Sequence, residues 1–296
     1  MEKTRVLILG SSGLIGNHLS KLLSKKYNVF NTHNKNKIFP NSIKIDILSK
    51  NSLRNAFEIA KPDVVVNLCA VYNNLEFCEN NKKLVMSING DSLEQISELS
   101  NQYSSHLIHL SSDYVFDGDV GNYKEEDPVN PINFYGKTKV VAEKNIQKIA
   151  NNFCIVRTSM VFGKNKIKQT LPDWILAKIN DVEKLEMISD QFTTPTYLDN
   201  LCLMLEEIIC NQYSGIIHLA GATKISRFQF AEKMLMILNI SPKKIVPISS
   251  KDFDLGNNRP KDSSLNTDKA KLILKEIPEE CDFSIKKYLL KNSEYT

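Results

Sequence analysis

Short apolar runs alternate with amphipathic segments along the first half of this chain. Residues 5–9, RVLIL, form an aliphatic run, and apolar positions recur at helical spacing over residues 14–23. Because strands that alternate with helices form parallel βαβ units, this pattern predicts a parallel sheet covered on both faces. Further strands are expected at 28–31, 42–45, 62–68 and from 106 and 153, and helices at 49–60, 84–102 and 135–149.

The second half of the chain is less regular. Helices are expected at 170–179, 199–209 and 227–238, and strands at 214–219 and 244–247. We therefore predict an α/β protein with a Rossmann-type, doubly wound parallel sheet and a smaller, interleaved C-terminal lobe. Residues 1–160 would form the sheet domain, with about 196–220 returning to it, and 161–296 mainly the lobe.

Composition narrows the class of protein. The 296 residues are 42% hydrophobic and 24% charged, and the net charge of +4 is spread along the chain. This is the balance of a globular protein, and it gives no reason to expect a nucleic-acid partner. No apolar run reaches the ~18 residues of a membrane span, and the six cysteines show no CxxC spacing. We therefore expect a cytoplasmic protein with free thiols and no membrane partner.

Three glycines mark the first turn from strand to helix. Gly10, Gly13 and Gly16 are spaced three apart in GSSGLIG. Such a turn lets the backbone approach a pyrophosphate, which the positive end of the helix dipole attracts. The plainer alternative is that Gly10 and Gly16 serve only tight packing of strand and helix. The GxxGxxG spacing resembles the short-chain dehydrogenase/reductase superfamily, and it makes residues 1–160 an expected NAD(P)-binding domain.

The end of the second expected strand bears on which nicotinamide cofactor binds. It reads NTHNKNK, without the acidic residue that holds the ribose of NAD in Rossmann units. Lys35 and Lys37, with Thr32 and His33, could instead accept a 2′-phosphate, or the lysines could be solvated loop charges. We favour NADP(H) and keep NAD(H) as the alternative. The superfamily resemblance also implies that Asp46 faces the adenine. The expected cofactor contacts in this region are Gly10, Ser12, Gly13, Leu14, Ile15, Gly16, His33, Asp46 and Ile47.

A tyrosine and a lysine four residues apart open the helix expected at 135–149. Tyr135 and Lys139 share a helix face, so the Lys139 ammonium can lower the pKa of the tyrosine and let it exchange a proton near neutral pH. Ser112, at the end of the preceding strand, would hydrogen-bond the same substrate oxygen. Asp113 would orient the substrate or cap the next turn. The plainer alternative for Tyr135 is a helix-start aromatic beside a surface lysine.

Four longer segments are informative: SSDYVFDG (111–118), KEEDPVNPINFYGKTK (124–139), VRTSMVFG (156–163) and DQFTTPTY (190–197). They resemble one branch of the superfamily, the dTDP-4-dehydrorhamnose reductase family. The resemblance implies that NAD(P)H reduces the 4-keto group of a nucleotide-activated deoxysugar. Tyr135 would supply the proton, and Ser112, Tyr135 and Lys139 would be the catalytic residues.

The same resemblance implies further contacts in this chain. The segment NLCAVYNNLEFCE adds Cys69, Ala70 and Tyr72 to the expected cofactor contacts, together with Tyr135 and Lys139. The expected substrate contacts are Ser112, Asp113, Met160 and Arg259, the last of which opens the C-terminal signature of RP followed by DSSLN. We expect residues 161–296 to form mainly the substrate-binding lobe.

Some positions depart from the family pattern. Met160 stands where the family has a tryptophan that packs on the sugar, and Thr193 or Thr194 replaces the usual glycine. Tyr114 follows Asp113, so the Asp-Glu pair of related 4,6-dehydratases is absent, which favours a reductase. These departures concern the identity of the sugar more than the chemistry.

A second function comes from the same family. It includes the regulatory β subunit of methionine adenosyltransferase, so a non-catalytic, NADP-binding subunit is the alternative to an enzyme. The resemblance also admits a homodimer, and Mg²⁺ at a subunit contact, for which the sequence assigns no ligands. His106 and His109 lie three apart on an expected strand and so on opposite faces, and we assign no metal site.

Overall fold

A seven-stranded parallel sheet forms the centre of the computed structural model, which describes residues 3–71, 74–252 and 259–292. The strand order is β11-β6-β5-β4-β1-β2-β3, so the chain reverses direction across the sheet between β1 and β4. The carboxyl ends of all seven strands meet at one edge, where α/β proteins bind ligands. The predicted Rossmann-type fold is confirmed. The strands are β1 (Arg5–Leu9), β2 (Asn28–His33), β3 (Ile43–Lys44), β4 (Val64–Asn67), β5 (His106–Leu110), β6 (Phe153–Arg157) and β11 (Gly215–His218).

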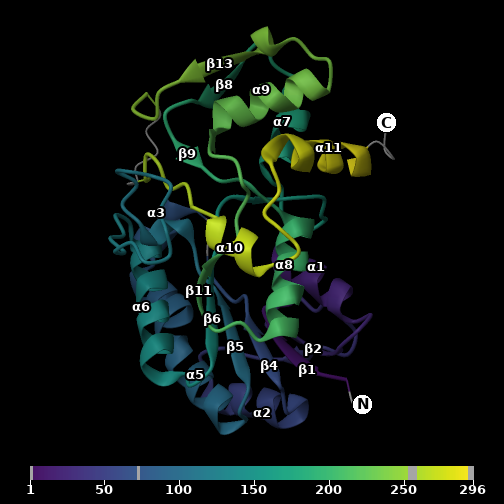
Figure 1. Ribbon diagram of the computed structural model, residues 1–296, viewed down its shortest axis with the longest axis vertical. Helices are drawn as coiled ribbons and strands as arrows, with labels where there is room; N and C mark the ends of the chain where they lie inside the picture. The colour runs from purple at the N-terminus through teal and green to yellow at the C-terminus, as the bar shows by residue number, and fades with distance from the viewer. Residues whose placement is uncertain (1–2, 72–73, 253–258, 293–296) are drawn as a thin grey trace.

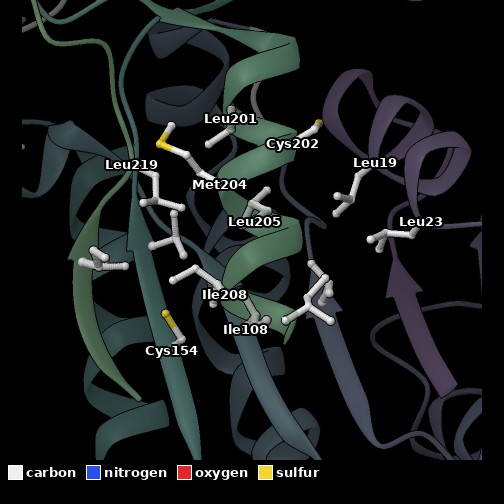
Figure 2. Close-up of a cluster of buried hydrophobic side chains, with 14 of the residues drawn as sticks. Leu19, Leu23, Ile108, Cys154, Leu201, Cys202, Met204, Leu205, Ile208 and Leu219 are labelled. Carbon is white, nitrogen blue, oxygen red and sulfur yellow. The ribbon is translucent and has the colours of Figure 1, made fainter. Parts of the chain in front are cut away.

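Helices cover both faces of this sheet (Figure 1). Along β1, Val6 and Ile8 join one apolar cluster and Leu7 and Leu9 the other, as the alternation of a strand requires. The first cluster holds α1 (Leu14–Leu23), α8 (Leu198–Asn211) and α10 (Asp268–Ile273) against the sheet. Figure 2 shows the side chains of α8 and α1 over the strands. The second cluster holds α2 (Lys50–Ala60), α5 (Ser92–Gln102) and α6 (Phe134–Ile149).

The second lobe stands at the carboxyl edge of the sheet (Figure 1). Its core is built around four fully buried aromatic residues, Phe162, Tyr197, Phe230 and Tyr288. The chain leaves this lobe through α8, adds β11 to the sheet and then returns, so the two parts are interleaved. The boundary near residue 160 stays a prediction. The lobe contains α7 (Leu171–Lys178), α9 (Arg227–Ile237), α11 (Cys281–Asn292) and the paired strands β8 (Leu185–Ile188) with β13 (Ile245–Ile248), β7 (Val161–Phe162) with β10 (Thr196–Tyr197), and β9 (Phe192–Thr193) with β12 (Ile225–Ser226).

Several elements differ from the sequence pattern. The helix expected at 84–102 consists of α4 (Lys82–Met86), a π-helical turn η1 (Ser87–Asp91) and α5. The pattern did not predict α3 (Leu75–Asn80), β8 or α10, since short elements give little periodic signal, and it did not predict α11. The part of the chain that the structure describes also contains the 3-10 turns η2 (Asp113–Val115) and η3 (Pro242–Lys244). Within the described residues, no helix is both long and apolar enough to cross a membrane.

Candidate active site

A cavity of about 750 Å³ lies between the carboxyl ends of the strands and the second lobe. It brings together residues that are far apart in the sequence. Its lining includes the predicted site residues Leu14, Ile15, Ala70, Ser112, Asp113, Tyr135, Lys139, Met160 and Arg259. The predicted cofactor residues Gly10, Ser12, Gly13, Gly16, His33, Asp46, Ile47 and Cys69 lie outside this lining. Tyr72 lies outside the described residues.

The glycine turn leaves the start of α1 open to an anion. Gly10 has φ +87°, and a Cβ on Gly16 would stand 2.3 Å from the Gly10 carbonyl oxygen, so these glycines do serve tight packing. Gly13 is the exposed N-cap of α1, where no side chain caps the helix and no acidic residue occupies the first turn. The first amides of a helix have no intrahelical acceptor, so this turn also fits a pyrophosphate. Gly10 and Gly16 are thus needed for packing, whereas Gly13 is exposed at the open helix start.

The end of β2 supports the glycine turn from one side. The hydroxyl of Thr32 donates to the Ile8 carbonyl (2.9 Å) and accepts from the Gly10 amide (3.2 Å), and Ser11 donates to the Thr32 carbonyl (2.6 Å). Thr32 is completely buried, so the expectation that it helps to accept a 2′-phosphate is wrong. His33 is buried too, with Nδ1 2.8 Å from the Ser42 hydroxyl.

The charged residues around this edge are exposed. Lys35 and Lys37 lie in an exposed loop after β2, and Asp46 is exposed after β3, where its carboxylate accepts a hydrogen bond from the Leu48 amide (3.0 Å). All three charges are thus accessible to a ligand. Ile47 is buried in the apolar cluster beneath them.

Two asparagines that the sequence analysis did not single out shape the loop after β4. Asn67 accepts a hydrogen bond from the Cys69 amide (3.1 Å). Asn89, in the π-helical turn, accepts from the Val71 amide (2.7 Å) and donates to the Val71 carbonyl (3.1 Å). Burial raises the pKa of the Cys69 thiol to about 12, so it stays protonated at neutral pH. π-helical turns of this kind are frequent at functional sites.

The face of α6 that carries Tyr135 and Lys139 is turned into the cavity. Asn133 caps the helix by accepting from the Gly136 amide (2.8 Å), and Gly136 lets the helix start lie directly against the Tyr114 carbonyl. Lys139 is only 2% exposed, and its ammonium lies 5.9 Å from the centre of the Tyr135 ring and donates to the Leu110 carbonyl (2.9 Å). Burial lowers the pKa of Lys139 to about 8. The alternative of a surface lysine beside Tyr135 is therefore wrong.

A buried carboxylate surrounded by hydroxyl groups lies at the carboxyl end of β5. Ser112 donates to one oxygen of Asp113 (2.9 Å), while Ser159 (2.8 Å) and Ser263 (2.6 Å) donate to the other. Burial raises the pKa of Asp113, and the three hydroxyl donors oppose that rise. The Ser159 hydroxyl also contacts that of Thr193. This cluster ties Ser112 to segments that follow β6 and precede α10.

Arg259 and Tyr114 line the cavity beside Tyr135. The Arg259 guanidinium donates to the Tyr114 hydroxyl (3.2 Å), and the Tyr114 ring meets the Tyr135 ring edge to face, with centroids 6.1 Å apart. Burial raises the pKa of Tyr114, and the Arg259 charge opposes this.

The geometry agrees with comparisons to known proteins. The family model described as the RmlD substrate binding domain matches residues 4–293. The chain belongs to the RmlD substrate-binding domain family. A dTDP-4-dehydrorhamnose reductase from Aggregatibacter actinomycetemcomitans is 31% identical over 239 residues, which are 77% of this chain and 76% of that protein. The predicted family and the predicted class of NAD(P)-dependent oxidoreductase are thereby confirmed.

Two further relatives of this RmlD-family chain bear on its cofactor and its role. The crystal structure of dTDP-4-dehydrorhamnose reductase from Bacillus anthracis in complex with NADP has a TM-score of 0.87 and 25% identity, and the match covers 98% of this chain and all of that one. Methionine adenosyltransferase 2 subunit beta from Danio rerio is 24% identical over 276 residues, 91% of this chain and 84% of that protein.

The sequence analysis did not single out Trp174, an aromatic residue of the cavity. Met160 stands where the family pattern has a tryptophan, and it lines the cavity half-buried. Trp174, the only tryptophan of the chain, lines the same cavity from α7. Its single occurrence was the signal that could have drawn attention to it. Arg227, at the start of α9, also lines the cavity.

Proposed function

We propose that this chain uses NADPH to reduce the 4-keto group of a nucleotide-activated deoxysugar. The observation that carries the proposal is the convergence of Ser112, Tyr135 and Lys139 on one cavity, beside the open start of α1. The relatives named as dTDP-4-dehydrorhamnose reductases support the same reaction.

The residues at the sheet edge fit a dinucleotide. Gly13 and the first amides of α1 would receive the pyrophosphate, and Lys35 and Lys37 the 2′-phosphate that distinguishes NADP(H) from NAD(H). The solved relative in complex with NADP supports this preference. When bound, the cofactor supplies the hydride.

Tyr135 is the proton donor in this proposal. As the substrate carbonyl becomes an alkoxide, the Tyr135 hydroxyl gives its proton to that oxygen, and the neighbouring Lys139 ammonium stabilises the phenolate that is left. Lys139 is held for this role by its bond to the Leu110 carbonyl. The Ser112 hydroxyl has a single proton, which it gives to Asp113 in the free site. When substrate binds, that proton would turn from Asp113 to the substrate oxygen and form the second hydrogen bond to it.

The lobe side of the cavity would hold the nucleotide. Arg227 and Arg259 are cations on this side, and guanidinium groups suit the two phosphates that join the sugar to the nucleoside. Trp174 offers a flat apolar surface further into the lobe. Met160 would cover the sugar ring without aromatic stacking.

A regulatory subunit is the second candidate, supported by the similarity to the β subunit of methionine adenosyltransferase. NADPH oxidation followed at 340 nm, with a dTDP-4-keto-6-deoxyhexose generated in situ, separates the two. The proposal expects turnover with NADPH and less with NADH. Saturable NADPH binding without turnover on any nucleotide sugar, together with co-purification of a methionine adenosyltransferase, would favour the regulatory subunit.

A further inference from the structure

The catalytic face of α6 continues beyond Tyr135 and Lys139 to a buried acid. Glu143 lies four residues after Lys139, on the same face of the helix and one turn further on. It is 2% exposed, and it does not line the cavity. A buried carboxylate at this place needs partners that hold its charge.

Two groups fix the Glu143 carboxylate. Arg157, at the end of β6, forms a bidentate salt bridge with it. Nε donates to Oε1 at 3.0 Å and Nη2 to Oε2 at 2.8 Å. The Ser111 hydroxyl donates to Oε1 at 2.5 Å. The carboxylate is therefore fastened to the ends of both β5 and β6, the strands beneath the catalytic residues.

Arg157 also has partners on the side away from Glu143. Its guanidinium stacks over the Phe116 ring, 5.1 Å from the centroid, and Nη1 donates to the Glu125 carbonyl at 3.3 Å and lies 3.5 Å from His218 Nε2. Glu125 in turn accepts from the His218 amide at 2.9 Å. This rigid support means that neither charge of the pair can turn away when Lys139 changes protonation.

The charges around Lys139 come from three elements. Burial favours the neutral amine, and the Glu143 carboxylate opposes that effect from the same helix. Cys69, in the loop after β4, is the other group acting on Lys139, and it is a neutral thiol at neutral pH. His109, on β5, is held neutral because burial keeps its pKa well below 6.5. Glu143 is thus the anion that supports the ammonium.

We propose that Glu143 is a positioning residue for the reaction: clamped by Arg157 and Ser111, its carboxylate keeps Lys139 charged beside Tyr135. The proposal rests on the proposed function for its catalytic consequence. It assigns the two adjacent serines different tasks, with Ser111 holding Glu143 behind the site and Ser112 facing the substrate.

The test is the pH profile of Glu143→Gln, with Glu125→Gln as a matched control. Glutamine keeps the shape and one acceptor but removes the charge, so the alkaline limb of kcat should move to lower pH by about one unit. Wild type and variant should converge near pH 6 and differ about tenfold on the alkaline side. Glu125→Gln removes a carboxylate from the same buried network without facing Lys139, and it should leave the limb in place. A uniform loss at every pH would show that Glu143 only holds the fold and would overturn the proposal.

Two further measurements deal with the unpaired Arg157 charge and with a possible lack of turnover. Glu143→Gln leaves the Arg157 cation buried without its carboxylate partner. The double variant Glu143→Gln/Arg157→Gln removes both charges, and its alkaline limb of kcat should still lie at lower pH than that of wild type. A wild-type profile in the double variant would contradict the proposal. The charge of Lys139 can be measured without turnover. Acetic anhydride labels the neutral amine over a series of pH values, and mass spectrometry gives the labelled fraction of Lys139. The pH midpoint of labelling should be lower in Glu143→Gln than in wild type, even if no nucleotide sugar is turned over. An unchanged midpoint would refute the role of Glu143 and would leave the proposed reductase function untouched.

Discussion

Alanine at Gly16 and alanine at Gly13 should have different consequences, because the two glycines do different work in the turn. A Cβ on Gly16 would stand 2.3 Å from the Gly10 carbonyl oxygen and 2.7 Å from Ser11 Cα. Both are backbone atoms, so the turn must open. Overpacking of this kind costs about 1–3 kcal/mol, and the better helix propensity of alanine offsets about 1 kcal/mol of it. Because both contacts are with backbone atoms, the upper part of this range applies, about 2–3 kcal/mol. After the offset, we expect Gly16→Ala to lose about 1–2 kcal/mol of unfolding free energy and to bind NADPH weakly.

Gly13→Ala is the matched comparison. The nearest atom to its Cβ is the Gly10 carbonyl oxygen at 3.4 Å, and its φ of −79° suits any residue. Stability should fall by only about 0.5–1 kcal/mol, the cost of alanine at a helix N-cap. NADPH affinity should still fall about tenfold, because a methyl group would stand between the α1 amides and the pyrophosphate.

Urea denaturation gives the stability of both variants, and titration of NADPH fluorescence gives the dissociation constants. Wild-type NADPH affinity in Gly13→Ala would refute the placement of the pyrophosphate on this turn. Wild-type stability in Gly16→Ala would refute the packing argument.

Three more expectations follow from the same geometry. Burial lowers the pKa of His218 to about 3, so the folded state stays neutral while the unfolded state takes up a proton below pH 6.5. This stability is present above pH 6.5 and is lost as pH falls, at about 1.4 kcal/mol per unit, and thermal melts at pH 7 and 5 should show a smaller loss for His218→Asn than for wild type. Trp174 is the only tryptophan, so dTDP added with NADP⁺ should change its fluorescence saturably, and an unchanged signal would place the nucleotide elsewhere. Replacing Lys35 and Lys37 with alanine should weaken NADPH binding about tenfold and leave NADH binding unchanged, whereas equal losses would contradict a 2′-phosphate contact.

The sequence pattern was sufficient for the sheet and for its covering helices other than α10. Strong apolar runs such as β1 and β4 and a glycine turn at a strand end are local signals, and they needed no tertiary information. The lobe was harder, because α11 and β8 are apolar only towards a core that Phe162 and Phe230 build from other segments. Short elements such as α3 and α10 carry too few residues for periodicity to identify them.

The candidate site likewise has residues that local sequence predicts and contacts that it does not. Tyr135, Lys139 and Ser112 could be predicted because they lie near one another in the sequence and follow a known order. Ser263 donates a hydrogen bond to Asp113, 150 positions away in the sequence, and no local spacing predicts such a contact. No local pattern in the sequence indicates that Lys139 is buried, and the proposed role of Glu143 depends on that burial.

Turnover of Tyr135→Phe tests the central claim most directly. The substitution removes one hydroxyl from the cavity and leaves the glycine turn and Lys139 untouched. NADPH oxidation with a dTDP-4-keto-6-deoxyhexose should slow by about 10²–10⁴-fold, since the proton donor is gone, while the dissociation constant for NADPH stays within about twofold of wild type. Turnover close to that of wild type, or NADPH affinity that is lost together with activity, would contradict the assignment of Tyr135 as the proton donor.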